Sequence, residues 1–185
     1  MQRTFTAVSL VLLATGCAGA SGTTTTPAPN TNPVVMIDEN GRTFRSTQSG
    51  TVASFDAPID SVWNAVLAAY SAMEMEANTL DRPGRTIGRN RLIIRRTFNG
   101  SRLSTFFSCG DDMVSGPNAN NGEITANVVS HLEESGSSTS VATMVTANIR
   151  LYTGTSGGAI RCGSTGELEE RLRKAIAKQL GVSSN

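Results

Sequence analysis

This sequence is poor in the residues from which most catalytic and metal sites are built. It has one histidine, one tryptophan and three cysteines among 185 residues, and aromatic residues make up only 5%. His131 has no cysteine or second histidine near it in the chain, so the ligand spacing of a zinc site is missing. The 16 basic and 15 acidic residues nearly balance, so the overall charge does not indicate a nucleic-acid-binding protein.

The N-terminus has the pattern of an export signal. Met1-Gln-Arg3 gives a positive start, and the apolar run Phe5–Ala14 is far shorter than the ~20 residues of a membrane-spanning helix. The small residues Ala14, Thr15 and Gly16 precede Cys17, and this stretch resembles the bacterial lipobox. The resemblance implies that residues 1–16 are removed and that the Cys17 thiol is linked to diacylglycerol. The alternative is an ordinary cleaved secretory signal in which Cys17 is incidental.

Residues 18–33 are expected to form a flexible tether between this anchor and a folded domain. They are rich in Ser, Thr, Gly, Pro and Asn and have no large apolar side chain, so they cannot offset the entropy cost of ordering. Two or three acyl chains anchor stably, because each buried methylene contributes about 0.8 kcal/mol. Ala18 differs from the aspartate that retains lipoproteins at the inner membrane of enterobacteria, so the resemblance implies the outer membrane, facing the periplasm. Residues 34–185 remain as a single domain of ordinary length.

The two remaining cysteines favour a disulfide. With Cys17 committed to lipid, Cys109 and Cys162 form an even pair in an oxidising compartment. Two free thiols are the alternative.

The domain pattern predicts an α+β fold: an antiparallel sheet with two main helices packed on one face. Apolar residues at helical spacing predict a first helix that starts at Ile59 and carries Trp63, and Leu168 to Leu180 predict a second, terminal helix. Residues 123–132 and 141–151 alternate in polarity and predict two antiparallel strands. Residues 34–45 are expected to form a hairpin or an ordered lead-in, and shorter strands are expected at 51–55, 75–81, 86–98 and 102–108. Residues 110–122 are expected to be a loop, and Ser164 to Glu167 has a capping-box pattern.

The opening Phe55-Asp-Ala-Pro58-Ile-Asp-Ser-Val-Trp63-Asn-Ala-Val-Leu67 resembles the strand-to-helix start of the START-like, polyketide-cyclase-like helix-grip families. It is also similar to the helix-grip modules of the lipoprotein of the β-barrel outer-membrane assembly machine. The resemblance implies either an apolar cavity between helix and sheet or a filled core used for protein contacts. The residues expected to line this cavity or core are Trp63, Leu67, Tyr70, Val128 and Val145.

Three other groups of residues are candidate sites. Gly154-Thr-Ser156-Gly-Gly158 matches the Gly-x-Ser-x-Gly pattern of serine hydrolases, but the histidine of that pattern follows the serine, whereas His131 precedes it, so a turn is predicted. The oxygen-rich residues between Asp111 and Glu123 match no recognised calcium loop. No metal or other cofactor is therefore expected.

An arginine run between residues 82 and 102 is the third group. It could present a positive stripe to a phosphorylated lipid headgroup or an acidic protein, or it could be an ordinary soluble surface. The candidate residues for this anionic-partner surface are Arg85, Arg89, Arg91 and Arg95.

These observations favour a non-enzymatic, lipid-anchored envelope protein whose domain contacts another envelope component. The alternative is a carrier or sensor for an apolar ligand, for which small inward residues at Ala126, Thr143 and Ala147 would have to leave a void. A cyclase-like enzyme is the third hypothesis, and it needs polar acid or base groups inside the cavity. The expected partners are the membrane, through the acyl chains, and an envelope protein or apolar ligand, but no nucleic acid.

Overall fold

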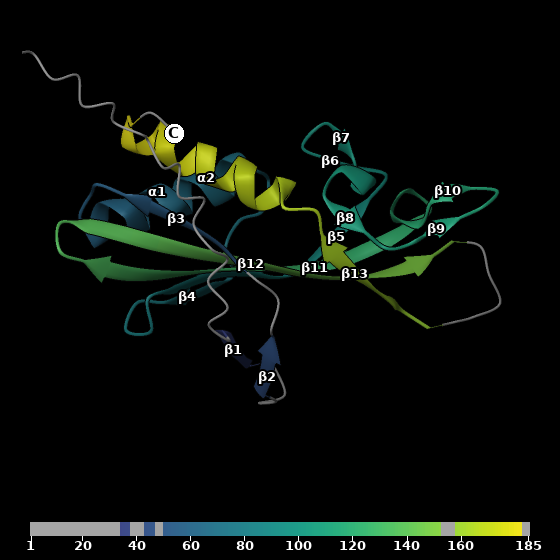
Figure 1. Ribbon diagram of the computed structural model, residues 1–185, viewed down its shortest axis with the longest axis horizontal. Helices are drawn as coiled ribbons and strands as arrows, with labels where there is room; N and C mark the ends of the chain where they lie inside the picture. The colour runs from purple at the N-terminus through teal and green to yellow at the C-terminus, as the bar shows by residue number, and fades with distance from the viewer. Residues whose placement is uncertain (1–33, 38–42, 47–49, 153–157, 183–185) are drawn as a thin grey trace, which may run out of the picture.

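The computed structural model describes residues 34–37, 43–46, 50–152 and 158–182. In this part of the chain a seven-stranded antiparallel sheet carries two helices on one face (Figure 1), which confirms the α+β prediction. The sheet strands and helices, in chain order, are β3 (Thr51–Phe55), α1 (Ile59–Ala72), β4 (Thr79–Asp81), β5 (Thr86–Arg95), β8 (Phe107–Ser108), β11 (Gly122–Ser135), β12 (Ser138–Leu151), β13 (Ile160–Ser164) and α2 (Glu167–Leu180).

The long hairpin of β11 and β12 forms the centre of the sheet. Its register runs without a break from Gly122 opposite Leu151 to Ser135 opposite Ser138. β5 pairs with the other edge of β11, and β4 pairs with β5. β3 and β13 pair with two successive stretches of the free edge of β12, and β8 extends β13. The alternating burial of the two hairpin strands confirms that one face of each is directed into the core.

Helix α1 confirms the helical spacing of apolar residues that predicted it. It buries Val62, Trp63, Val66 and Tyr70 on one side, and both helices lie over the same face of the sheet (Figure 1). Beyond its last turn, the side chain of Asn99 donates a hydrogen bond to the carbonyl oxygen of Met73 at 2.9 Å. This bond satisfies one of the carbonyl groups that a helix leaves without an internal partner.

The expected capping box before α2 is wrong. The residue that precedes the helix is Gly166, with φ 89°, a conformation that favours glycine. The Ser164 hydroxyl instead donates to the Glu169 carboxylate at 2.8 Å and accepts from the Gly166 N–H at 3.1 Å. Gly181 ends the helix in the left-handed conformation (φ 69°), which confirms it as the stop signal.

The connection from β5 to β11 differs most from the sequence-based expectation. The predicted strand 102–108 is wrong in its first part, because Leu103–Thr105 form a 3₁₀ turn and only Phe107–Ser108 pair as β8. Within the predicted loop there is a small hairpin, β9 (Asp111–Asp112) with β10 (Gly116–Pro117), and a second 3₁₀ turn, Asn118–Asn120. A further small hairpin joins β6 (Thr97–Phe98) to β7 (Ser101–Arg102). The Asp112 side chain bonds Val114 and Ser115 within the β9–β10 turn, and Asn120 bonds Ser104 across the two 3₁₀ turns. Hydrophobic periodicity does not report such bonds.

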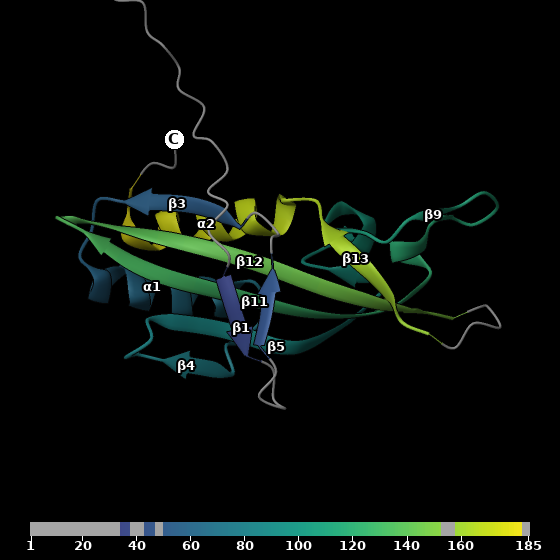
Figure 2. The ribbon, with the colours of Figure 1, turned by 60° about the horizontal axis from the view of Figure 1, so that its bottom comes forward.

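The predicted N-terminal hairpin is present as β1 (Val34–Ile37) and β2 (Thr43–Ser46), paired antiparallel. Figures 1 and 2 show it on the side of the sheet away from the helices, here called the outer face. On this face Met144 of β12 is only 3% exposed, although it does not belong to the core beneath the helices.

Candidate contact surface

Between the helices and the sheet, the described side chains pack into one hydrophobic core. Trp63, Tyr70, Val128 and Val145 are at most 4% exposed, and Leu67 is partly buried against them. The five residues expected to line a cavity or core thus lie together in the core. The small inward residues Ala126, Thr143 and Ala147 are also buried.

A short chain of hydroxyl groups crosses this core from α1 to the central hairpin. The Tyr70 hydroxyl lies 3.1 Å from Ser130 Oγ, which lies 3.0 Å from Thr143 Oγ1. All three side chains are buried, and each hydroxyl therefore has a partner in place of water. Burial raises the pKa of Tyr70 far above its ordinary value, because the phenolate would lose its hydration.

A cavity of about 10 Å³ lies next to Thr143, the last of these three hydroxyl residues, between α2, β3 and β12. Its lining includes Thr143, Glu169 and Arg173. That volume admits about one water molecule, whereas a cavity that binds benzene measures on the order of 150 Å³. Glu169 is an inward carboxylate of the kind that enzymatic chemistry would need, but a space of this size does not admit an organic substrate.

The arginine run does not form one stripe. Arg82 bonds Asp60 at 2.9 Å and lies over the Trp63 ring, 4.9 Å from its centroid. Arg85 pairs with Glu134 at 3.6 Å near the far end of the hairpin. Arg89 is partly buried, and its buried Nε has no hydrogen-bond partner among the residues that the structure describes.

Arg91 and Arg95 lie farther along β5. Arg91 is exposed and lies within a bulge in the pairing of β5 with β11, where its N–H donates to the Asn127 side-chain oxygen at 2.9 Å. Arg95 is exposed on the outer face, where its Nε donates to the Glu123 carboxylate at 2.7 Å.

The outer face gathers arginines from other strands around Arg95. Glu123 of β11 pairs in register with Arg95 on one side and with Arg150 of β12 on the other. The adjacent row places Ile93, Thr125, Asn148 and Arg161 side by side on β5, β11, β12 and β13. Directly paired residues of antiparallel strands point to the same face. We call this set the arginine face: Ile93, Arg95, Glu123, Thr125, Asn148, Arg150 and Arg161.

Sequence reasoning missed Arg150 and Arg161. The signal for Arg150 was present, because inward Ile149 and Leu151 leave residue 150 on the opposite face. Arg161 lies on β13, which has no alternating pattern long enough to predict a strand. Its neighbours on the arginine face are determined by the pairing of Asn148 with Arg161.

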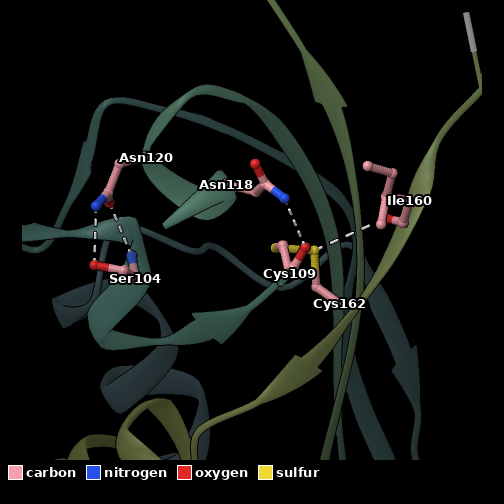
Figure 3. The surroundings of a disulfide bond; sticks show 6 residues. All are labelled: Ser104, Cys109, Asn118, Asn120, Ile160 and Cys162. Atoms are coloured by element: carbon pink, nitrogen blue, oxygen red, sulfur yellow. Dashed lines mark hydrogen bonds between the residues drawn. A yellow bond between two sulfur atoms is a disulfide. The ribbon is translucent and has the colours of Figure 1, made fainter. Parts of the chain in front are cut away.

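The predicted disulfide between Cys109 and Cys162 is present, with the sulfur atoms 2.04 Å apart. Figure 3 shows the bond and two of the neighbouring loop side chains. Asn118 donates to the Cys109 carbonyl oxygen, and Asn120 bonds both the backbone and the hydroxyl of Ser104. The disulfide therefore holds the end of β8, and the loop that follows it, against β13.

The oxygen-rich loop uses its side chains for its own structure. Asp112 accepts hydrogen bonds from the N–H groups of Val114 and Ser115 and from the Ser115 hydroxyl, and these bonds lower the pKa of Asp112. Among the described residues no three His, Cys, Asp or Glu side chains are grouped as a metal site. His131 is exposed on β11 next to Thr86.

Two expectations fall outside the described residues: the lipidated Cys17 and the turn around Ser156. No described helix has both the length and the apolar character needed to span a membrane. No protein-family model matches this chain, and no curated protein matches it.

Proposed function

We propose that this protein is a lipid-anchored component of the bacterial cell envelope, held through Cys17 at the outer membrane, and that its domain is a non-enzymatic contact module. The sequence pattern of residues 1–33 supports the anchor and the tether. The observation that carries the contact role is the contrast between the two faces of the sheet. The side chains of the face beneath the helices are buried in the core, whereas on the outer face Arg150 and Arg161 are exposed and Ile93 is about half exposed.

A carrier function has less support from this geometry. An apolar ligand needs an enclosed space of several hundred Å³, and the cavity beside Thr143 holds about one water. The inward side chains of the sheet pack against α1 and α2 instead. Arginine is enriched at protein contact surfaces, whose buried centre is more apolar than the rest of the surface.

The test of the anchor is the mass of the protein extracted from membranes of cells that express the full chain. We expect an N-terminal peptide that begins at Cys17 and carries diacylglycerol. The Cys17→Ala variant should lose this modification. An unmodified peptide that begins at another residue would contradict the anchor and favour an ordinary secreted protein.

The test of the contact role is native mass spectrometry of residues 18–185 produced in an oxidising compartment. A bare native mass, equal to the denatured mass, is the expected result. Extra mass that disappears on denaturation would show a retained small ligand and would overturn the contact role in favour of a carrier. Alkylation of the denatured chain without reductant should add nothing, because Cys109 and Cys162 are bonded.

A further inference from the structure

We propose that the arginine face binds a carboxylate-rich segment of a partner protein. This inference rests on the proposed contact function and names the chemistry of the partner. Arg95 already has a carboxylate, that of Glu123. Arg150 and Arg161 are exposed, and within the described residues neither has an acidic partner.

The spacing of the arginine face suits several carboxylates. Adjacent strands lie about 4.8 Å apart, so Arg95 and Arg150, separated by one strand, are about 10 Å apart along the row. Arg161 lies in the next row, one strand farther. The planar guanidinium group matches a carboxylate in two parallel hydrogen bonds. An extended acidic segment can therefore meet Arg150 and Arg161 with separate side chains.

Ile93 adds an apolar contact to this surface. It lies in the same row as Arg161 and is 52% exposed. An aliphatic side chain among arginines favours a protein partner, because contact surfaces bury apolar groups at their centre and satisfy charges around them.

A residue with a left-handed backbone lies next to the arginine face. Arg96 directly follows Arg95, is exposed, and has φ 65°. This left-handed conformation costs free energy for any residue with a Cβ and is adopted readily by glycine. Glu74, Arg85, Arg91 and Asn99 share this conformation, so the strain alone does not mark a site, and a binding role for the Arg96 side chain is decided by substitution.

The observations favour a protein segment over two other occupants. A second copy of this chain, joined through the same face, would bring together two surfaces that each carry three arginines and one glutamate, and this net like charge disfavours the pairing. A flat lipid surface would meet the β1–β2 hairpin, which lies on the same side of the sheet (Figures 1 and 2). An acidic segment is narrow enough to lie beside this hairpin.

The test uses residues 18–185, which contain the whole hydrophobic core and the disulfide. The probe is a fluorescent peptide of about eight residues that alternates glutamate with threonine, long enough to cross the four strands of the arginine face. Binding is measured by fluorescence anisotropy at low and at high salt, with a lysine–threonine peptide that carries the same label. We expect binding of the glutamate peptide only, weakened by salt.

Variants locate this binding. The double variant Arg150→Glu and Arg161→Glu should bind the glutamate peptide about tenfold more weakly. The control, Arg102→Glu with Lys178→Glu, changes two exposed residues outside the arginine face and alters the net charge equally. It should bind within about twofold of the unchanged chain, since only long-range charge is altered. Equal effects of the two double variants would overturn the proposal, because binding would then follow net charge alone.

Two further results complete the test. Arg96→Gly should weaken peptide binding. It should leave the urea midpoint unchanged or raise it, since glycine adopts the left-handed backbone without strain. A lower midpoint with unchanged binding would contradict a binding role for Arg96. Absence of glutamate-peptide binding would overturn the proposal, as would arginine-dependent sedimentation with phosphatidylethanolamine–phosphatidylglycerol vesicles in place of peptide binding. The anchor and native-mass measurements are independent of both results, so they separate failure of this inference from failure of the proposed function.

Discussion

Replacing Cys109 and Cys162 together with alanine should remove about 4 kcal/mol from the free energy of unfolding. The bond joins residues separated by 53 positions. In the chain-entropy model, a crosslink over such a loop restricts the unfolded chain and so raises the free energy of unfolding by about 4 kcal/mol at 25 °C. Domains of this size are stable by about 5–15 kcal/mol. The loss is therefore large enough to leave a marginal domain partly unfolded.

Equilibrium unfolding in urea, followed by Trp63 fluorescence, measures this loss. The unchanged chain with reductant is the matched control, because it keeps both buried sulfur atoms while losing the bond. Its stability should lie close to that of the double variant, with a further small loss in the variant from the missing sulfur contacts. A double variant within about 1 kcal/mol of the oxidised chain would refute the reasoning, since the unfolded chain would then be restrained by something other than the disulfide.

Three further experiments test the core, the acid dependence and the central hairpin. Tyr70→Phe should lower the free energy of unfolding by about 1 kcal/mol at pH 7, because a buried hydrogen bond is lost. Since burial raises the pKa of Tyr70, the unchanged chain should lose stability as the pH rises above about 10, whereas the variant should not. Urea midpoints from pH 8 to 11 measure this difference. The hydrogen bond from Arg173 is the main cause that lowers the pKa of Glu170 to about 2. The ionised Glu170 should therefore add less than about 1 kcal/mol to the free energy of unfolding, since the pair is partly exposed, and this contribution should fade as the pH falls from about 4.5 towards 2. Acid unfolding curves of Glu170→Gln should lack this dependence. A Cβ at Gly122 would lie 2.4 Å from a backbone carbonyl oxygen, whereas one at Gly88 would meet its nearest atom at 3.4 Å, so Gly122→Ala should lower the melting temperature by the equivalent of roughly 1–3 kcal/mol and Gly88→Ala much less.

Periodic segments were predicted well because their burial follows from local spacing. The stripe from Val62 to Tyr70 and the alternation along β11 and β12 repeat over many residues, and both have the predicted type. Residues 103–105 were expected to continue a strand and instead form a 3₁₀ turn. There the chain follows particular hydrogen bonds, such as that from the Ser104 N–H to Asn120, which no hydrophobic pattern reports.

The grouping of the arginines likewise depends on tertiary pairing that the sequence pattern does not report. Arginine is frequent between residues 82 and 102, but pairing with Asp60, Glu134 and Glu123 divides these side chains among separate parts of the molecule. The arginines that do lie together come from β5, β12 and β13. Their grouping follows from strand register, which links residues more than 50 positions apart.

The sequence by itself determined the α+β class, the two helices, the central hairpin and the pairing of the two domain cysteines. Each depends on spacing along the chain or on the small number of residues of one kind, and both can be counted without coordinates. Only the tertiary structure decided that the helices fill the inner face and that Arg95, Arg150 and Arg161 share the outer one. Both facts depend on which distant segments pack together, because packing volume and strand register are properties of the assembled sheet.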